Sequence, residues 1–410
     1  MCYNTSCILS YDILIASQLE ERIDLLANKK GDKMENEIII GGVKLKFPRM
    51  ISENRRKQLP PEALLMNLKF YAGSPEERIL SGYWSDYAFL GVIYQIQMAW
   101  LIRLLSTLKM FESDISRLKK LKRQFTPALY LAIKEQEETN PVKAVQAAIR
   151  KLLNNNQMEH LQSFVGLGIE EKDILQLAYA ITWKNCNEEV ARLLINLLTE
   201  KLEGVAVKYA DSSVVLGNQI TTVEKELAVY AVRLEYALKK LNSIQLRCTL
   251  SSTTFLGLTN LYPEVDWLGV AQQFMSVDLN LVYEELLPVT ECLRSICDRY
   301  QCVDRIMSQL NETLKVFIDK RILNGVGETN NSKEFSIRIA YNLIQRTSDD
   351  TYYLKSCIRD VGFHLKDTEK EGTVLDFDSL GDCALIFGYM YLSTKNLINI
   401  LDNLKVDNLP

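Results

Sequence analysis

The stretch from Thr222 to Ile244, TVEKELAVYAVRLEYALKKLNSI, decides the fold of this chain. Its apolar residues recur at spacings of three and four, which places them on one face of an α-helix. That face consists of Val223, Leu227, Tyr230, Leu234, Ala237 and Leu241. The charged residues lie largely off it. The pattern predicts a long helix with one buried side, as in a helical bundle.

The same helical period recurs along most of the chain. Nine prolines in 410 residues, most of them near expected helix ends, leave room for long helices. We expect further helices at about 85–110, 141–154, 188–209, 267–279 and 288–323. The segment from Glu37 to Phe47, EIIIGGVKLKF, alternates around a Gly-Gly turn and predicts one small hairpin. The expected fold class is mainly α: an elongated helical bundle with a small N-terminal hairpin.

Composition excludes several classes of partner. With 47% hydrophobic residues the chain can bury a sizeable core. Lysine and arginine number 48 against 52 aspartate and glutamate, so the net charge of -4 provides no general attraction to nucleic acid or to an anionic membrane. The longest late apolar run, Ala384 to Leu392, is far shorter than a membrane span. We therefore expect neither a nucleic acid nor a membrane as partner.

The cysteines and histidines predict no metal site. Nine cysteines are scattered without a C-x-x-C pair, and two histidines, His160 and His364, cannot complete a usual zinc shell. This usage is typical of reduced thiols in a cytoplasmic protein. We expect no metal and no cofactor. The first residues lack the pattern of a signal peptide, and translation could begin at Met1 or at Met34.

Three segments of the chain carry a family resemblance. Ala206 to Tyr209, then Glu224 to Leu241, then Tyr262-Pro-Glu-Val-Asp-Trp267 with Gln273-Phe274, follow one another in the sequence. Together they resemble adenylosuccinate lyase, although Glu224 stands where that family has glycine. Weaker matches are Ser85-Asp-Tyr-Ala-Phe-Leu90 with Trp100-Leu101, Glu138 to Val145, and Asp376 to Leu380. The resemblance extends from about Ser85 to Leu392. Within it, we interpret the hexapeptide as the start of a bundle helix, because proline and acidic residues favour a first helical turn.

The resemblance implies a fold, an assembly and a chemistry. Adenylosuccinate lyases belong to the fumarase and aspartase superfamily, whose mostly helical, three-domain subunits form homotetramers with active sites built from three subunits. Their reaction is a β-elimination that releases fumarate and needs a base and an acid on opposite sides of the breaking bond. We expect the segments 1–75 (N-terminal extension with the hairpin), 76–185 (helical domain), 186–325 (central bundle) and 326–410 (C-terminal helical region).

The loops that carry the family's chemistry are rewritten here. The first, with a histidine in Arg-Thr-His-Gly-Gln, corresponds to Asp211 to Ile220, which has none. The second, Thr-Ser-Glu-Asp, corresponds to Gly168-Ile-Glu-Glu-Lys-Asp173. In the third, Asn-His-Asp has become Asn140-Pro141. The signature loop corresponds to Asn324 to Lys333, which lacks the double serine, the methionine and both prolines.

Few candidate site residues remain after these losses. In the signature loop only Ser332 and Lys333 could act as base and oxyanion donor, and helix capping is the simpler role for Ser332. The resemblance assigns substrate binding to residues in and beside the other loops: Lys143, Gln219, Thr221 and Thr222. The phosphate-gripping Asp-Gly-Arg-Tyr has no counterpart, with Arg78 as a weak substitute.

Two functional interpretations follow. Helix interiors persist while the catalytic loops are rewritten, which favours a catalytically impaired or repurposed lyase homologue. Its role would be assembly: as a homotetramer, or with an intact lyase or another enzyme. The alternative is an active lyase-fold enzyme that eliminates fumarate, or performs a related C-N or C-O lyase reaction, on a non-standard substrate. A helical structural protein that only keeps the bundle is a third alternative.

Overall fold

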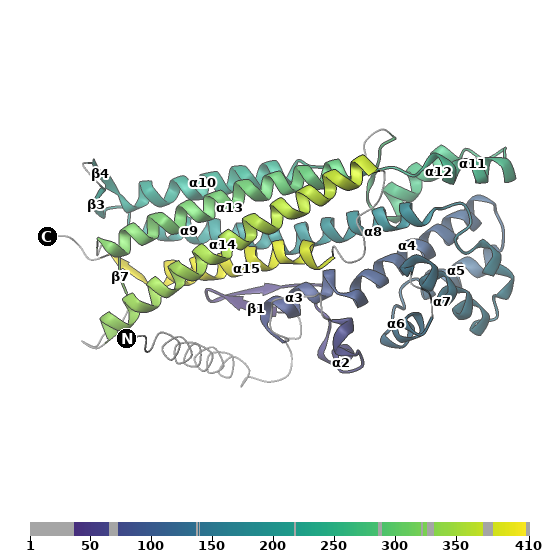
Figure 1. Ribbon diagram of the computed structural model, residues 1–410, viewed down its shortest axis with the longest axis horizontal. Helices are drawn as coiled ribbons and strands as arrows, with labels where there is room; N and C mark the ends of the chain where they lie inside the picture. The colour runs from purple at the N-terminus through teal and green to yellow at the C-terminus, as the bar shows by residue number, and fades with distance from the viewer. Residues whose placement is uncertain are drawn as a thin grey trace, which may run out of the picture.

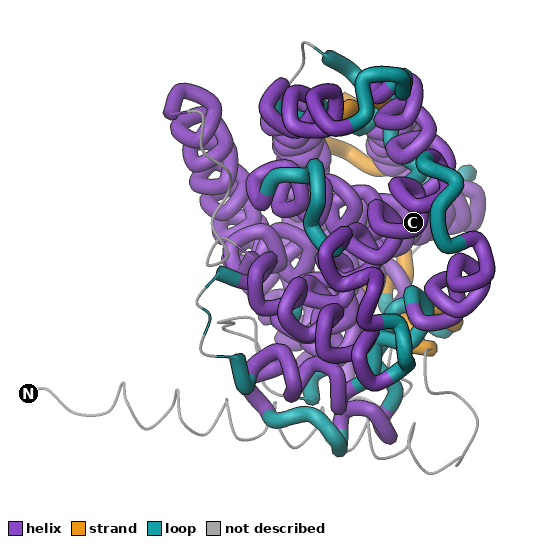
Figure 2. Tube along the Cα trace, turned by 90° about the vertical axis from the view of Figure 1, so that its right-hand side faces the viewer, coloured by secondary structure: helices purple, strands orange, loops and turns teal. Residues whose placement is uncertain are grey.

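The computed structural model describes residues 37–64, 73–136, 138, 140–216, 219–285, 289–320, 323–325, 332–371 and 380–406. The predicted bundle is present and runs along the length of the molecule (Figure 1). Its helices are α8 (Glu171–Cys186), α9 (Arg192–Lys208), α10 (Val223–Asn242), α13 (Val289–Asp319), α14 (Ser332–Glu371) and α15 (Leu380–Asp402). Figure 2 views the molecule from the end that carries α11 and α12 and shows that most of it is helical. Helix α10 packs on α9 and α13, and α14 packs on α13 and α15.

Helices α8 and α9 form one continuous helical run. The π-helix η3 (Asn187–Ala191) joins them without a break. The run therefore extends from Glu171 to Lys208 and is about 57 Å long at 1.5 Å per residue. This length separates the two ends of the bundle, and it decides which loops can meet within one chain.

The stripe on α10 is buried as predicted. Leu227 and Leu234 are inaccessible to solvent, and α10 packs against α9 and α13. Tyr230 is half-buried, and its hydroxyl lies 2.7 Å from the Thr313 Oγ1 of α13. Burial of an apolar stripe on both neighbours is the main stabilising contribution of such a helix.

A second group of helices lies at one end of the bundle (Figure 1). It consists of α4 (Asp86–Thr107), α5 (Glu112–Leu121), α6 (Pro127–Lys134), α7 (Pro141–Asn155) and η2 (Glu159–Phe164), and α3 (Pro75–Trp84) leads into it from beside α15. Short elements precede it: α2 (Glu53–Arg56) and η1 (Pro61–Ala63). The run Pro75–Thr107 is long and apolar enough to span a membrane, but most of its apolar window is buried inside the fold. Here it is a core helix pair, interrupted at Ser85, whose side chain caps α4.

Aromatic rings join this group to the bundle. Trp84 of α3 lies edge-on to Trp183 of α8 with 5.5 Å between ring centroids, and it stacks on Phe387 of α15 at 5.7 Å. Tyr300 of α13 approaches Phe387 at 5.6 Å. All four rings are buried. Such a cluster contributes both area burial and favourable ring geometry, so it ties four helices into one core.

The strands are short and paired in twos. The predicted hairpin is confirmed as β1 (Glu37–Ile40) antiparallel to β2 (Val43–Lys46). Its turn residues, Gly41 and Gly42, have φ of 55° and 76°, which favours glycine. A Cβ on Gly41 would lie 2.4 Å from Ile398 of α15, so the glycine also permits close packing. The other pairs are β3 (Ser213–Leu216) with β4 (Gln219–Thr222), β5 (Arg247–Cys248) with β6 (Val282–Tyr283), and β7 (Leu323–Gly325) with β8 (Leu404–Val406).

One sequence expectation about the hexapeptide Tyr262 to Trp267 is wrong. The pattern predicts that it supplies the first turn of a bundle helix, but α12 (Trp267–Gln273) begins at its last residue and continues only into the π-helix η4 (Phe274–Asp278). Asp266 is the N-cap, and its side chain accepts a hydrogen bond from Gly269 N at 3.0 Å. Helix α12 packs beside α11 (Ser252–Leu261) at the end of the molecule. The division into four segments stays a prediction; α14 and α15, from its last segment, pack on α13 and α9.

Candidate functional site

Two of the rewritten loops meet at the starts of α7 and α8. Asn140 caps α7, since its Oδ1 accepts hydrogen bonds from Val142 N at 2.9 Å and Lys143 N at 3.2 Å. Its Nδ2 donates to Glu171 Oε2 at 2.7 Å. Lys143 Nζ lies 3.4 Å from the other oxygen of the same carboxylate. The lysine that the resemblance assigns to substrate is therefore paired with a carboxylate from the second loop.

Glu170 adds a second carboxylate at the start of α8. It is the N-cap residue of that helix, and its carboxylate lies 3.1 Å from Lys172 Nζ. A hydrogen bond from the Thr253 hydroxyl, followed by Lys172, holds the pKa of Glu170 below its ordinary value. The positive end of the helix dipole favours an anion at this position. The protein's own side chains thus supply the negative charge that this helix start attracts.

Asp173 connects α8 to α11. Its carboxylate is buried and accepts hydrogen bonds from the hydroxyls of Ser251 at 2.8 Å and Thr254 at 2.7 Å, and from Ser251 N at 3.1 Å. Burial raises the pKa of Asp173, and the three hydrogen bonds only partly offset that effect. The Thr254 hydroxyl in turn accepts from Glu170 N at 3.3 Å. This carboxylate holds two helix starts together, which is a structural role.

The α7–α8 junction has several polar side chains, but most of those described there already have a partner within the chain. Within the described residues of this junction, Lys143, Glu170 and Glu171 all have charged partners, and the Asp173 carboxylate is saturated by donors. The described part of the chain holds no group of three or more metal-ligating side chains. The junction can fix helix ends in place. A proton transfer there would require one of these pairs to open.

The remaining candidate residues lie at the other end of the bundle. Gln219 is exposed on β4, opposite Leu216 of β3. Thr221 is half-buried, and the Thr222 hydroxyl accepts a hydrogen bond from Lys225 N at 3.2 Å, so Thr222 is the N-cap of α10. Lys320 Nζ, at the end of α13, donates to Val215 O at 3.2 Å. The first loop therefore lies beside the segment that leads toward the signature loop.

Ser332 and Lys333 are the first two residues of α14. Their side chains lie outside the described part of the structure, so their predicted roles stay predictions. The signature-loop position begins as β7, which pairs with β8 through Asn324 and Lys405. In one chain this end of the bundle is separated from the α7–α8 junction by the helical run α8–η3–α9, as Figure 1 shows.

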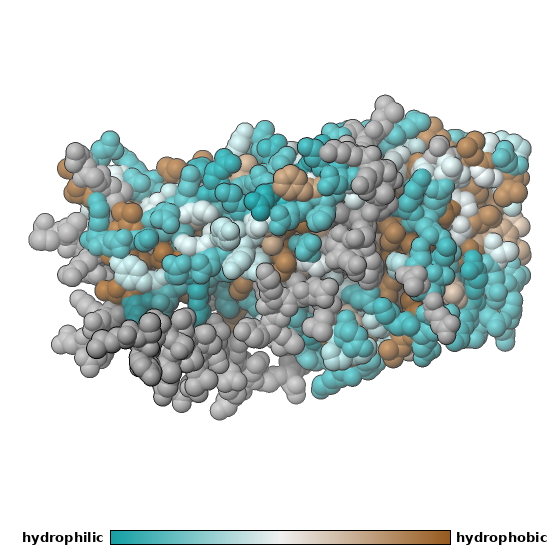
Figure 3. Space-filling view, in the orientation of Figure 1, coloured by the Kyte–Doolittle hydropathy of each residue, from teal (hydrophilic) through white to brown (hydrophobic). Residues whose placement is uncertain are grey.

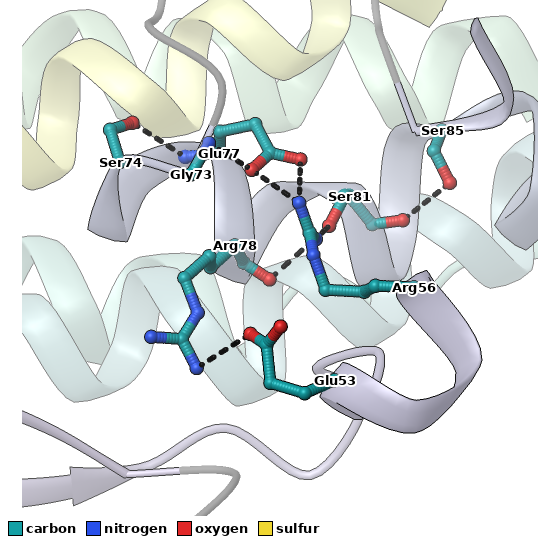
Figure 4. A network of polar contacts seen from close by, with 8 residues as sticks. All are labelled: Glu53, Arg56, Gly73, Ser74, Glu77, Arg78, Ser81 and Ser85. Carbon is teal, nitrogen blue, oxygen red and sulfur yellow. Dashed lines mark hydrogen bonds and ion pairs between the residues drawn. The ribbon is translucent and has the colours of Figure 1, made fainter. Parts of the chain in front are cut away.

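Arg78, the weak substitute for a phosphate contact, already has a partner. Its guanidinium lies 3.4 Å from the Glu53 carboxylate. Beside it Arg56 donates to both oxygens of Glu77 at 2.8 and 2.7 Å and to Ser81 Oγ at 3.0 Å (Figure 4). The paired charges join α2 to α3. This network stabilises the fold, and its arginines point toward carboxylates of the chain itself.

Sequence reasoning missed several of these contacts. Glu171, Ser251 and Thr254 were not singled out, although each is central to the junction. The run of four hydroxyl residues from Ser251 to Thr254 is a signal that could have suggested a helix start rich in donors. Nothing in the sequence pattern could have shown that these donors meet Asp173.

Comparisons with known proteins agree with this architecture. No protein-family profile matches the chain. The chain is 24% identical over 246 residues to adenylosuccinate lyase of Buchnera aphidicola subsp. Schizaphis graminum, covering 56% of this chain and 54% of that protein. It is 27% identical over 244 residues to the same enzyme of subsp. Baizongia pistaciae, covering 55% and 52%. The chain thus spans about half the length of the relatives that it matches in sequence.

Solved structures show the same fold. The 3-carboxy-cis,cis-muconate lactonizing enzyme of Pseudomonas putida superposes with a TM-score of 0.58 at 15% identity, over 80% of this chain and 75% of that one. The fumarate lyase of Mesorhizobium sp. BNC1 superposes with a TM-score of 0.58 at 13% identity, over the same shares. The chain is therefore a low-identity relative of adenylosuccinate lyases in sequence, and it has the mainly helical fold of these solved structures.

Proposed function

We propose that this chain is an adenylosuccinate lyase-like protein with impaired catalysis, whose retained helical bundle serves assembly with itself or with an intact lyase. The observation that carries the proposal is the start of α8. There the second loop keeps its acidic character, with Glu170 and Glu171, but lacks the hydroxyl pair that, by the resemblance, would hold a carboxylate of the substrate. A substrate carboxylate arriving there would meet two negative charges, and like charges at such distances repel.

The loss of acid–base groups supports the same conclusion. Elimination needs a base and an acid near neutral pKa. The two histidines of the chain, His160 and His364, lie outside all four loop positions. His160 lies within η2, and its Nε2 is 2.9 Å from Asp114 Oδ2 of α5. Lys143, the cation that persists, is paired with Glu171.

The proposal of assembly is supported by the length of the bundle. Because the α7–α8 junction and the β3–β4 end are about 57 Å apart along the α8–α9 run, they could form one site only if another copy ran beside the first. Helix α14 offers an exposed aromatic strip: Tyr341, Tyr352 and Phe363 follow one another at intervals of 11 residues. Residues 11 apart lie within about 20° of the same helix face. We propose that this strip contacts a second copy of the chain.

Activity measurements test the proposal. Purified full-length protein is incubated with adenylosuccinate and, separately, with argininosuccinate, and release of fumarate is followed by ultraviolet absorbance, with an intact adenylosuccinate lyase as the positive control. We expect no turnover above the buffer rate. Turnover that is lost in Lys143→Ala or in Ser332→Ala, with the fold unchanged by circular dichroism, would refute impaired catalysis.

The alternative function is an active lyase-fold enzyme for a non-standard substrate, and turnover in the assay above would support it. One observation favours it: Lys143 lies at the start of α7, where the helix dipole favours an anionic ligand, and 52% of its side chain is exposed. A panel of succinyl amines and succinyl ethers, scored by fumarate release, extends the same assay to this alternative.

A further inference from the structure

Helix α14 packs on α13 and α15, and these three helices carry polar side chains in the core. Six of them are buried: Asp304 and Asn311 of α13, Thr347 and Thr351 of α14, and Ser393 and Thr394 of α15. Asn311 Nδ2 donates to Ile344 O and to Ser348 Oγ of α14, both at 3.0 Å. The attachment of α14 therefore depends on buried polar groups as well as on apolar contacts.

Asp304 is a buried acid on the α13 side of α14. It lies seven residues before Asn311, about two helical turns, and so on the same face of α13. Its Oδ1 is buried and has no hydrogen-bond partner among the described residues. Burial raises the pKa of Asp304 to about 7, and the exposed cations Lys355 of α14 and Arg305 of α13 only partly oppose that effect. Protonation therefore removes a buried charge where α13 meets α14.

Asp350 is a second acid, on the α15 side of α14. Its Oδ2 accepts a hydrogen bond from Asn396 Nδ2 of α15 at 3.0 Å. Burial raises the pKa of Asp350 to about 7, the neighbouring Asp349 adds to the effect, and Arg346 opposes it. One acid thus lies on each of the two sides from which α14 is held.

Glu76 brings α3 into the junction around Asp350. It is a buried carboxylate in the first turn of α3, and its charge also raises the pKa of Asp350. Lys395 Nζ of α15 lies 3.9 Å from Glu76 Oε1. The charge of Asp350 in turn raises the pKa of Tyr389 of α15. Two acids share one nearby ammonium group here, so a proton on Asp350 relieves the repulsion between them.

We infer that α14 is a proton-controlled helix: Asp304 and Asp350 hold it against α13 and α15 while they are protonated, and loss of their protons as the pH rises favours its opening. The inference goes beyond the proposed function and does not depend on whether catalysis remains.

The sign and size of the effect follow from proton release. An aspartate that opening exposes to water has a pKa of about 3.9. Between that pH and about 7, the open helix therefore releases a proton from each acid that the closed helix keeps. The equilibrium constant for opening should rise about tenfold per pH unit for each acid and level off above pH 7.

Hydrogen exchange of matched variants tests the inference. The full-length protein and Asp350→Asn are exchanged side by side between pH 5 and pH 8, and peptides of α14 are followed by mass spectrometry. Because the intrinsic exchange rate cancels at equal pH, the ratio of the parent rate to the variant rate reports the proton of Asp350. That ratio should rise about tenfold per pH unit and become constant above pH 7. Asp360→Asn, which changes an exposed carboxylate of the same helix, is the control, and its ratio should stay constant.

A second variant and a second helix complete the test. For Asp304→Asn combined with Asp350→Asn, the ratio should rise about a hundredfold per pH unit, because two protons are then absent. After correction for intrinsic rates, α14 peptides should exchange faster than α4 peptides at pH 8, since α14 opens while the rest stays folded. A constant ratio for Asp350→Asn, a double variant that matches the single one, or equal rates in α14 and α4 would overturn the inference.

Discussion

Lys143 Nζ and Glu171 Oε1 lie 3.4 Å apart where the starts of α7 and α8 meet, so a lysine that the family resemblance assigns to substrate faces a carboxylate of its own chain. The pair is accessible: 52% of the lysine side chain and 38% of the glutamate side chain are exposed. Because exposed ion pairs contribute little to stability, this pair matters more for the charge at the candidate site.

Figure 3 shows hydrophobic residues at both ends of the molecule, with a mostly hydrophilic surface between them.

The ion pairs Arg56–Glu77 and Lys143–Glu171 should differ sharply in how much they contribute to the free energy of unfolding. Glu171→Ala should lower the free energy of unfolding by at most about 1 kcal/mol, because exposed ion pairs contribute little. Glu77→Ala should lower it by about 3–5 kcal/mol, because it leaves the mostly buried Arg56 guanidinium without its carboxylate partner and with only Ser81 Oγ as an acceptor. Urea denaturation of both variants is the measurement. Equal losses would contradict the assigned difference in burial.

Asp173 should be required for the attachment of α11. Asp173→Ala removes the acceptor of three hydrogen bonds, and each buried donor left without a partner costs about 1–3 kcal/mol. Hydrogen exchange at the amides of α11 should accelerate in this variant. Asp173→Asn, which keeps one acceptor oxygen, is the control and should show a smaller effect. Unchanged exchange in the alanine variant would show that α11 is held by its other contacts.

Stability should depend on pH through Asp304 of α13. Burial raises its pKa to about 7, although Lys355 and Arg305 favour the ionised form. An unfolded aspartate has a pKa of about 3.9, so between that pH and 7 the folded protein keeps a proton that the unfolded chain has released. Stability therefore falls as pH rises through this window, by about 4 kcal/mol in total.

Asp304→Asn removes that dependence. The variant should melt at a higher temperature than the parent protein at pH 8 and at nearly the same temperature at pH 4. Asp298→Asn, which changes an exposed carboxylate on the same helix, is the matched control and should leave the pH profile unchanged. Parallel melting curves for the Asp304 variant and the parent across pH 4 to 8 would show that Asp304 titrates normally.

The two sides of α10 should respond differently to charge. Leu234→Glu places a carboxylate in the contact with α9 and α13 and should cost more than about 4 kcal/mol, enough to lose soluble protein. Val229→Glu, on the exposed side, should change the free energy of unfolding by no more than about 0.5 kcal/mol. Circular dichroism melts of both variants give the comparison. A stable Leu234 variant would refute burial of the stripe.

The aromatic strip on α14 should control self-association. Tyr352 and Phe363 are 69% and 58% exposed, and a double change of both to glutamate should lower the sedimenting mass because charge opposes burial of the strip between copies. Helix content should be retained. Val316→Glu, which changes an exposed residue on α13, is the control. If the double variant keeps the parent mass, the contact between copies lies elsewhere.

The sequence alone determined the helices of the bundle and the N-terminal hairpin. These elements depend on local chemistry: the apolar period of 222–244 buries one side of a helix, and Gly41–Gly42 permits a tight turn. The prediction from local sequence was wrong at Tyr262 to Trp267. The proline and the acidic residues there precede the helix, and Asp266 is its N-cap.

The tertiary structure decided which side chains meet. Glu171 is 28 residues from Lys143, and Asp173 is 78 residues from Ser251, so no periodicity could pair them. Their contacts arise because long, rigid helices bring distant starts to one junction, where buried polar groups must find partners. The same rigidity keeps the two ends of the α8–α9 run about 57 Å apart. The sequence identifies the loops that lack the family's histidines. Only the packing shows that the polar groups at the α7–α8 junction pair with carboxylates of the same chain.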